Sequence, residues 1–147
     1  MKNRMLFIFL LVITIITAAC GGGDSYQRDV NNISACFGDA FEDLHDFFPG
    51  GQVSGPLPAS DQFVPIMEQY QKCFAQVNQL ETPETYPDVH KDVLEARDEM
   101  FTGANGLVFW LSRNNNSDAL LEKIQSAVDQ MEEGHEAFLD AAEQLGE

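Results

Sequence analysis

The sequence predicts an all-α protein, an antiparallel up-down-up-down four-helix bundle, and three observations support this. Four segments carry apolar residues at the three- and four-residue spacing of one helix face. The segments are similar in length, and one long and two short connections join them. No strand-like alternation of apolar and polar residues and no internal repeat competes with this pattern. We therefore expect one bundle domain over residues 28–147.

The first helix is predicted over residues 28–48, with start signals at Asp24, Asp29 and the pair Asn31-Asn32. Residues 49–60 contain three Pro and three Gly, so they form a long loop that cannot continue the helix. The apolar stripe of this helix comprises Ile33, Phe37, Ala40, Phe41, Leu44 and Phe48.

The second helix is predicted over residues 61–81, capped by Ser60 or Asp61 and ended before Thr82-Pro83. Tyr86-Pro87-Asp88 opens the third helix, because Pro is well tolerated at the first helical position. The second stripe comprises Phe63, Ile66, Met67, Tyr70, Phe74 and Val77; the third comprises Val89, Val93, Met100, Ala104, Leu107, Val108 and Leu111.

Residues 114–116, three consecutive Asn, stop the third helix. Ser117 or Asp118 then caps the fourth. Its inward face comprises Leu120, Ile124, Val128, Met131, Phe138, Ala142 and Leu145. The short connection predicts that the third and fourth helices are antiparallel neighbours.

The N-terminus has the pattern of a signal peptide. Lys2 and Arg4 precede the apolar run of residues 5–16, and small residues lead from there to Cys20. The run is shorter than the roughly 20 residues of a membrane-spanning helix. Three Gly follow the cysteine, so we expect residues 20–27 to be a flexible tether.

Residues 1–23 resemble the signal of bacterial lipoproteins, in which small residues precede a lipid-bearing Cys. Thr17 stands where that family most often has Leu. The resemblance implies removal of residues 1–19, diacylglycerol on the sulfur of Cys20 and an extracytoplasmic protein that lipid anchors to a bacterial cell membrane. An uncleaved N-terminal anchor and an ordinary signal peptide cut nearby are the alternatives. All three would export the domain.

The charge of the chain excludes whole classes of partner. It has 8 Lys and Arg against 24 Asp and Glu, a formal net charge of −16. Nucleic acids and anionic lipid headgroups would be repelled. We therefore expect no nucleic-acid partner, and membrane attachment has to come from the lipid on Cys20.

Cys36 and Cys73 remain once Cys20 carries lipid, and they have one possible pairing. Each lies about eight residues from the end that the first two helices share, so both fall at one level of the bundle. An exported protein can keep a disulfide. The alternative is two free buried thiols.

Arg97, His135 and Tyr70 form the first candidate ligand site. His135 and Arg97 both fall on the apolar stripes of their helices and at one level across the turn at 114–117. The Tyr70 hydroxyl, Glu132 or Glu136 could accept their hydrogen bonds. Arg97 would hold an anion or a carboxylate ligand; the alternative is a satisfied polar network that fixes helix register.

A metal or haem site centred on His135 is the rival hypothesis. Residues 42–45 and 132–135 both read Glu-x-x-His, the spacing of di-iron bundles. Glu42 should point away from the core, however, so solvated helix faces are the simpler explanation, and we expect no metal and no cofactor. Noncovalent haem would use His135 with Met100, Met131 or Met67 as axial ligand.

Trp110 marks a second candidate site. With Phe109 it makes the end of the third helix apolar almost all round, and Phe47, Phe48, Val53 and Leu57 lie in or beside the long loop. These regions could form an open aromatic groove far from the tether, or a small core beneath the loop.

No nucleophile elbow, phosphate loop or zinc-protease motif occurs in the sequence. We expect no enzymatic activity. The sequence favours a non-catalytic binding or interaction module of the cell envelope, with an unknown envelope protein or small ligand as its partner.

Overall fold

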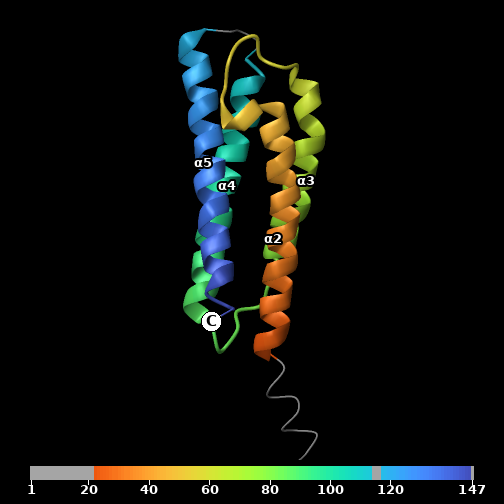
Figure 1. Ribbon diagram of the computed structural model, residues 1–147, viewed down its shortest axis with the longest axis vertical. Helices are drawn as coiled ribbons and strands as arrows, with labels where there is room; N and C mark the ends of the chain where they lie inside the picture. The colour runs from red at the N-terminus through yellow and green to blue at the C-terminus, as the bar shows by residue number, and fades with distance from the viewer. Residues whose placement is uncertain (1–21, 114–116, 147) are drawn as a thin grey trace, which may run out of the picture.

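The computed structural model describes residues 22–113 and 117–146, and within them the regular structure is entirely helical. The four α-helices of the described residues pack together, and Figure 1 shows the start of α2 and the C-terminus at the same end. They are α2 (Gly22–Phe47), α3 (Val64–Val77), α4 (Pro87–Leu111) and α5 (Asp118–Glu143). The all-helical class is confirmed, whereas the signal peptide and Cys20 lie outside the described residues.

Helix α2 begins at Gly22, six residues earlier than predicted. Tyr26 and Val30 are buried and continue the apolar stripe toward the N-terminus. The Tyr26 hydroxyl also lies 3.0 Å from Nδ1 of His90 on α4. Residues 22–27 are therefore helical, and the predicted flexible tether is wrong over this range.

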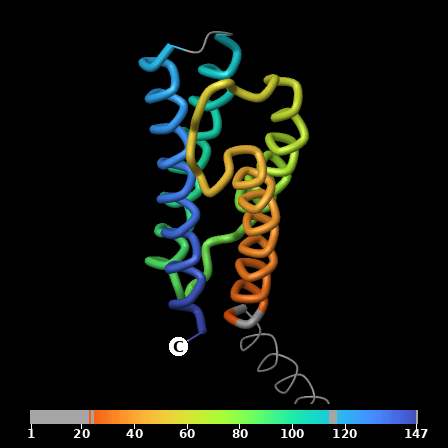
Figure 2. The backbone as a smooth tube through the Cα atoms, turned by 45° about the horizontal axis from the view of Figure 1, so that its top comes forward, coloured from red at the N-terminus to blue at the C-terminus, as the bar shows by residue number. Residues whose placement is uncertain are grey.

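The long connection between α2 and α3 swings toward α5 before it returns (Figure 2). It contains two short 3-10 helices, η1 (Pro49–Gly51) and η2 (Ser60–Phe63). Gln125 of α5 fastens it: its Oε1 accepts from the backbone N–H of Val53 at 2.7 Å, and its Nε2 donates to the carbonyl of Gly51 at 2.8 Å. The loop thus lies against the bundle.

Helix α3 differs from the prediction at both ends. Neither Ser60 nor Asp61 caps it, because η2 precedes it and α3 itself starts at Val64 without a side-chain cap. Pro65 in the first turn has no N–H to satisfy, which reduces the need for a cap. The helix ends at Val77, four residues earlier than expected.

The start of α5 agrees with the prediction, since Oγ of Ser117 accepts from the backbone N–H of Leu120 at 3.3 Å. No helix in the two described ranges is both long and apolar enough to span a membrane.

Helices α4 and α5 make the most extensive contact of the fold, and two glycines bring their backbones close. A Cβ at Gly103 would lie 2.7 Å from Cγ of Met131 and 2.8 Å from the carbonyl oxygen of Ala127. A Cβ at Gly134 would lie 2.8 Å from the backbone nitrogen of Met100. Because real side chains do not tolerate such distances, only glycine permits this approach.

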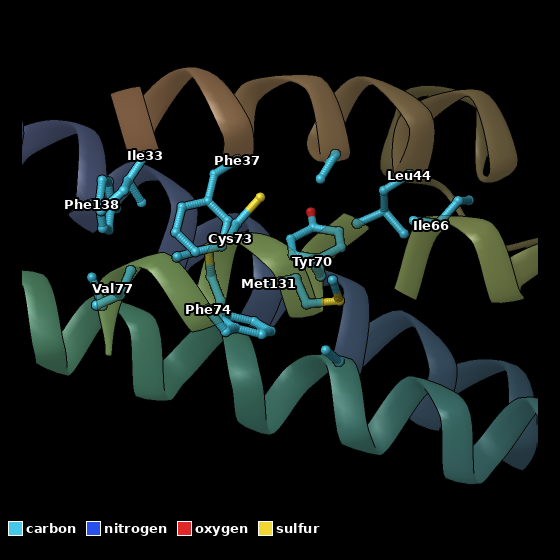
Figure 3. Packing of buried hydrophobic residues seen from close by; sticks show 14 of the residues in the cluster. Ile33, Phe37, Leu44, Ile66, Tyr70, Cys73, Phe74, Val77, Met131 and Phe138 are labelled. Carbon is cyan, nitrogen blue, oxygen red and sulfur yellow. The ribbon is translucent and has the colours of Figure 1, made fainter. Parts of the chain in front are cut away.

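A disulfide joins α2 to α3. Cys36 and Cys73 are bonded, with their Cα atoms 5.7 Å apart, so the predicted pairing is confirmed and the alternative of free thiols is wrong. Beside it the rings of Phe37 and Phe74 lie 5.4 Å apart. Figure 3 shows Phe37, Cys73 and Phe74 together in the core between these helices.

Candidate functional site

A polar cluster lies between α2 and α5. Nε2 of His45 lies 2.8 Å from Oε1 of Glu132, so His45 donates a hydrogen bond to this carboxylate. The Phe41 ring sits 4.3 Å from the His45 ring and 4.4 Å from the His135 ring. The two Glu-x-x-His segments therefore meet, with one contributing a histidine and the other a glutamate.

His135 is a core residue of this cluster, with 7% of its surface exposed. Burial lowers its pKa; the nearby Glu136 carboxylate opposes this shift, and His45 adds to it. Its Nε2 is buried and has no hydrogen-bond partner among the described residues. The ring is therefore neutral near pH 7.

Tyr70 is fully buried, and Figure 3 shows its hydroxyl directed toward α2. Burial raises its pKa, and the carboxylates of Glu132 and Asp43 raise it further. The phenol stays protonated, although its oxygen also lacks a hydrogen-bond partner within the described part of the chain.

Arg97 lies outside this cluster, at the contact between α4 and the end of α3. Its Nη1 donates to Oδ1 of Asn78, beyond the end of α3, at 2.6 Å. Its Nε is buried and lies 2.8 Å from Oδ1 of Asp98, yet is not aligned as a donor, so we regard that contact as an ion pair only. Arg97 therefore faces α3 while His135 faces α2, and within residues 22–113 and 117–146 no hydrogen bond or ion pair joins them into the predicted ligand pocket.

The methionines considered as haem ligands lie in other surroundings. Met100 packs against Gly134, Met131 packs against Gly103, and Met67 lines a surface groove. Within residues 22–113 and 117–146, no group of three or more His, Cys, Asp and Glu side chains is arranged to hold a metal ion.

Trp110 is half-buried at the end of α4, with its ring 4.6 Å from that of Phe109. Phe109 is exposed, and the guanidinium of Arg113 lies 4.3 Å from its ring centroid. At the loop, Phe47 packs on Phe48 and on Phe63, with ring centroids 4.7 and 5.3 Å apart. These loop contacts are those of a small core beneath the loop.

A groove with a largely apolar lining runs between η2–α3 and the end of α4. Its volume is about 520 Å³. Two valines on opposite walls, Val64 and Val108, are 52% and 46% exposed. The lining consists of Phe63, Val64, Met67, Val108 and Leu111, with Ser60, Glu68, Gln71, Asn105 and Ser112.

The groove was not predicted from the sequence, because the apolar spacing puts Val108 on the inward face and leaves Val64 off the predicted stripe. The groove depends on where α3 starts after η2, which the apolar spacing does not specify. The available signal was Val64 itself, an apolar residue off the predicted stripe and beside a proline.

Comparison with known proteins finds no family model, no curated protein and no solved structure that matches the chain. The geometry of the groove and of the buried cluster is therefore the basis for a functional proposal.

Proposed function

We propose that this protein is a lipid-anchored, extracytoplasmic module of a bacterial cell envelope that binds a partner through the groove between α3 and α4. The groove is the observation that carries the proposal: half-exposed valines face one another across it in a strongly acidic chain. Exposed apolar surface of this kind is typical of interaction sites.

The position of the groove fits a tethered binder. In Figure 1, α3 begins and α4 ends at the end of the molecule opposite the start of α2. A lipid on Cys20 would therefore hold the N-terminal end near the membrane and leave the groove facing away from it. The lipoprotein-like signal supports the anchor, and the Cys36–Cys73 disulfide suits an exported protein.

We also propose that the four helices form the antiparallel up-down-up-down bundle. The contacts between neighbours support this direction: on α2 and α5, Phe37 pairs with Phe138 and His45 with Glu132, so the partner's number falls as the residue's number rises. Arg97 and Phe101 of α4 likewise meet Asn78 and Phe74 in reverse order.

A non-catalytic role is supported by the state of the polar cluster. A general base has to reach its substrate, but His135 is buried against Phe41, and Glu132 is engaged by His45. We therefore assign these groups to the packing of the bundle rather than to chemistry.

Photocrosslinking in the native host tests the function. We would place a photoreactive residue at Val108 in the full chain and, as a matched exposed apolar control, at Leu139 on α5. We expect discrete adducts from position 108 alone, in the membrane fraction. Cys20→Ser should abolish incorporation of a labelled fatty acid into the protein. Equal crosslinking at both positions, or fatty-acid labelling that persists in Cys20→Ser, would contradict the proposal.

A further inference from the structure

The groove has a floor and two walls between which a helix could bind. Phe63 forms a buried floor, while Val64 on one wall and Val108 on the other project from α3 and α4. Along α4, Phe101 lies seven residues before Val108, hence on the same face and about 10 Å away. Phe101 is 48% exposed and packs edge-on against Phe74. Phe101 and Val108 thus form an apolar strip along α4 that is about two helical turns long.

The charge of the whole chain, rather than that of the groove lining alone, favours a cationic partner. Glu68 is the one charged residue in the lining of the groove, and Asp61 lies next to Ser60 on η2. Among nearby cations, Arg113 is engaged with the ring of Phe109, and Lys72 lies one turn beyond Glu68 on α3. With a chain charge of −16, the surface attracts a cation and repels a second copy of itself.

We propose that the groove between α3 and α4 binds a cationic amphipathic helix of another protein, with apolar side chains between Val64 and Val108 and Lys or Arg beside Glu68. In helix-in-groove recognition the bound helix places apolar anchors at positions i, i+3, i+4 and i+7, so that they lie along one face. This inference rests on the proposed function and specifies its partner class.

The test uses two labelled model peptides of about four helical turns with the same leucine face. One carries Lys on its polar face and the other carries Glu. Binding is measured by fluorescence anisotropy to the full, host-processed protein in phosphatidylcholine nanodiscs at about 0.15 M salt, where surface charges are partly screened. Empty nanodiscs give the background. We expect a Kd for the Lys peptide that is at least about tenfold lower than that for the Glu peptide.

Substitutions separate groove binding from general attraction to an acidic surface. Val64→Glu and Val108→Glu should each raise the Kd of the Lys peptide about tenfold. Leu139→Glu adds the same charge at an exposed apolar residue of α5 and should leave the Kd within about twofold. Pure charge attraction would instead strengthen in all three variants. Because the two valines are half-exposed and lie on different helices, loss of folding in one variant leaves the other informative.

Three results would overturn the proposal: equal binding of both peptides, no binding of the Lys peptide, or binding that Val64→Glu and Val108→Glu leave unchanged. Self-association of the wild type that Val108→Glu abolishes would also overturn it, because the occupant would then be a second copy. If Val108 still crosslinks in cells while the Lys peptide fails to bind, the proposed function survives and only this partner class is wrong. If both experiments fail, both proposals are wrong.

Discussion

The helix pair α4–α5 and the helix pair α2–α3 are each held together, but by different means. Gly103 and Gly134 let the backbones of α4 and α5 approach closely, across a connection of only a few residues. The α2–α3 pair has the long loop and is joined by the Cys36–Cys73 disulfide. Because closing a longer loop costs more entropy, the pair with the long connection gains most from a covalent link.

Removing the disulfide should lower the free energy of unfolding more than substitution of a glycine or a histidine does. The double variant Cys36→Ala/Cys73→Ala should lower the free energy of unfolding by about 4 kcal/mol, because the unfolded chain loses a closed loop of some 38 residues. Urea unfolding followed by far-UV circular dichroism measures this. Reduction of the wild type should give a similar loss. A change below about 1 kcal/mol in both cases would show that packing alone holds this helix pair together.

A methyl group between α4 and α5 should have the next largest effect. Gly134→Ala places a Cβ against backbone atoms of Met100 and Ala96, so we expect a loss of about 2 kcal/mol despite the better helix propensity of Ala. The matched control is Gly38→Ala on α2, where a Cβ would meet nothing within 4 Å. It should stabilise by up to about 1 kcal/mol. Thermal unfolding of both variants checks the opposite signs; equal signs would refute the close approach.

In the loop after α2, Ala substitutions at two adjacent glycines should differ by a smaller loss of stability. Gly50 and Gly51 both have positive φ, 65° and 71°, so Ala at either costs about 1 kcal/mol in backbone strain. A Cβ at Gly51 would also collide with the Glu132 carboxylate, whereas one at Gly50 would enter open space. Gly51→Ala should therefore destabilise by about 1 kcal/mol more than Gly50→Ala in urea unfolding. Equal losses would mean that Glu132 moves aside freely.

Acid should weaken the seam between α2 and α5, with the smallest effect of the four. Burial lowers the pKa of His135 in the folded state, so the unfolded chain binds the proton first as the pH falls. The stability is fully present above the unfolded pKa of about 6.5 and is lost as the pH falls through the folded pKa. One proton contributes a slope of at most about 1.4 kcal/mol per pH unit.

Replacement of the histidine isolates this effect. His135→Leu should reduce the loss of stability between about pH 7 and pH 5, measured by urea unfolding at each pH. His45→Gln keeps a donor for Glu132 and leaves His135 in place. The stability of this variant should therefore still fall with acid as it does in the wild type. If His135→Leu loses stability with acid as steeply as the wild type, another group controls the response.

The predictable parts of the fold are those that local chemistry specifies. Ser117 caps α5 because its hydroxyl accepts an N–H three residues on, and Cys36 pairs with Cys73 because both lie at one level. The start of α2 was missed because Tyr26 is polar at its tip and follows three glycines. Its burial depends on His90, 64 residues away, and such a contact is invisible to local periodicity.

The site was less predictable than the fold. Arg97 and His135 do lie on inward-facing stripes, but a stripe in a bundle faces two neighbours. The level along the axis can be predicted, whereas the choice of neighbour depends on how each helix is rotated. The same rotation exposes Val108 and buries Leu107, so the groove could be found only from the assembled helices.

The early start of α2 has a mechanical consequence. Only Gly21 stands between Cys20 and Gly22, a chain length of about 7 Å, and α2 continues from Gly22 for 26 residues, about 40 Å of helix. An acyl anchor on Cys20 would have almost no slack. The groove would then stay at a nearly fixed distance from Cys20 while the bundle tilts, so a partner would need to present its cationic helix at that distance from the anchor.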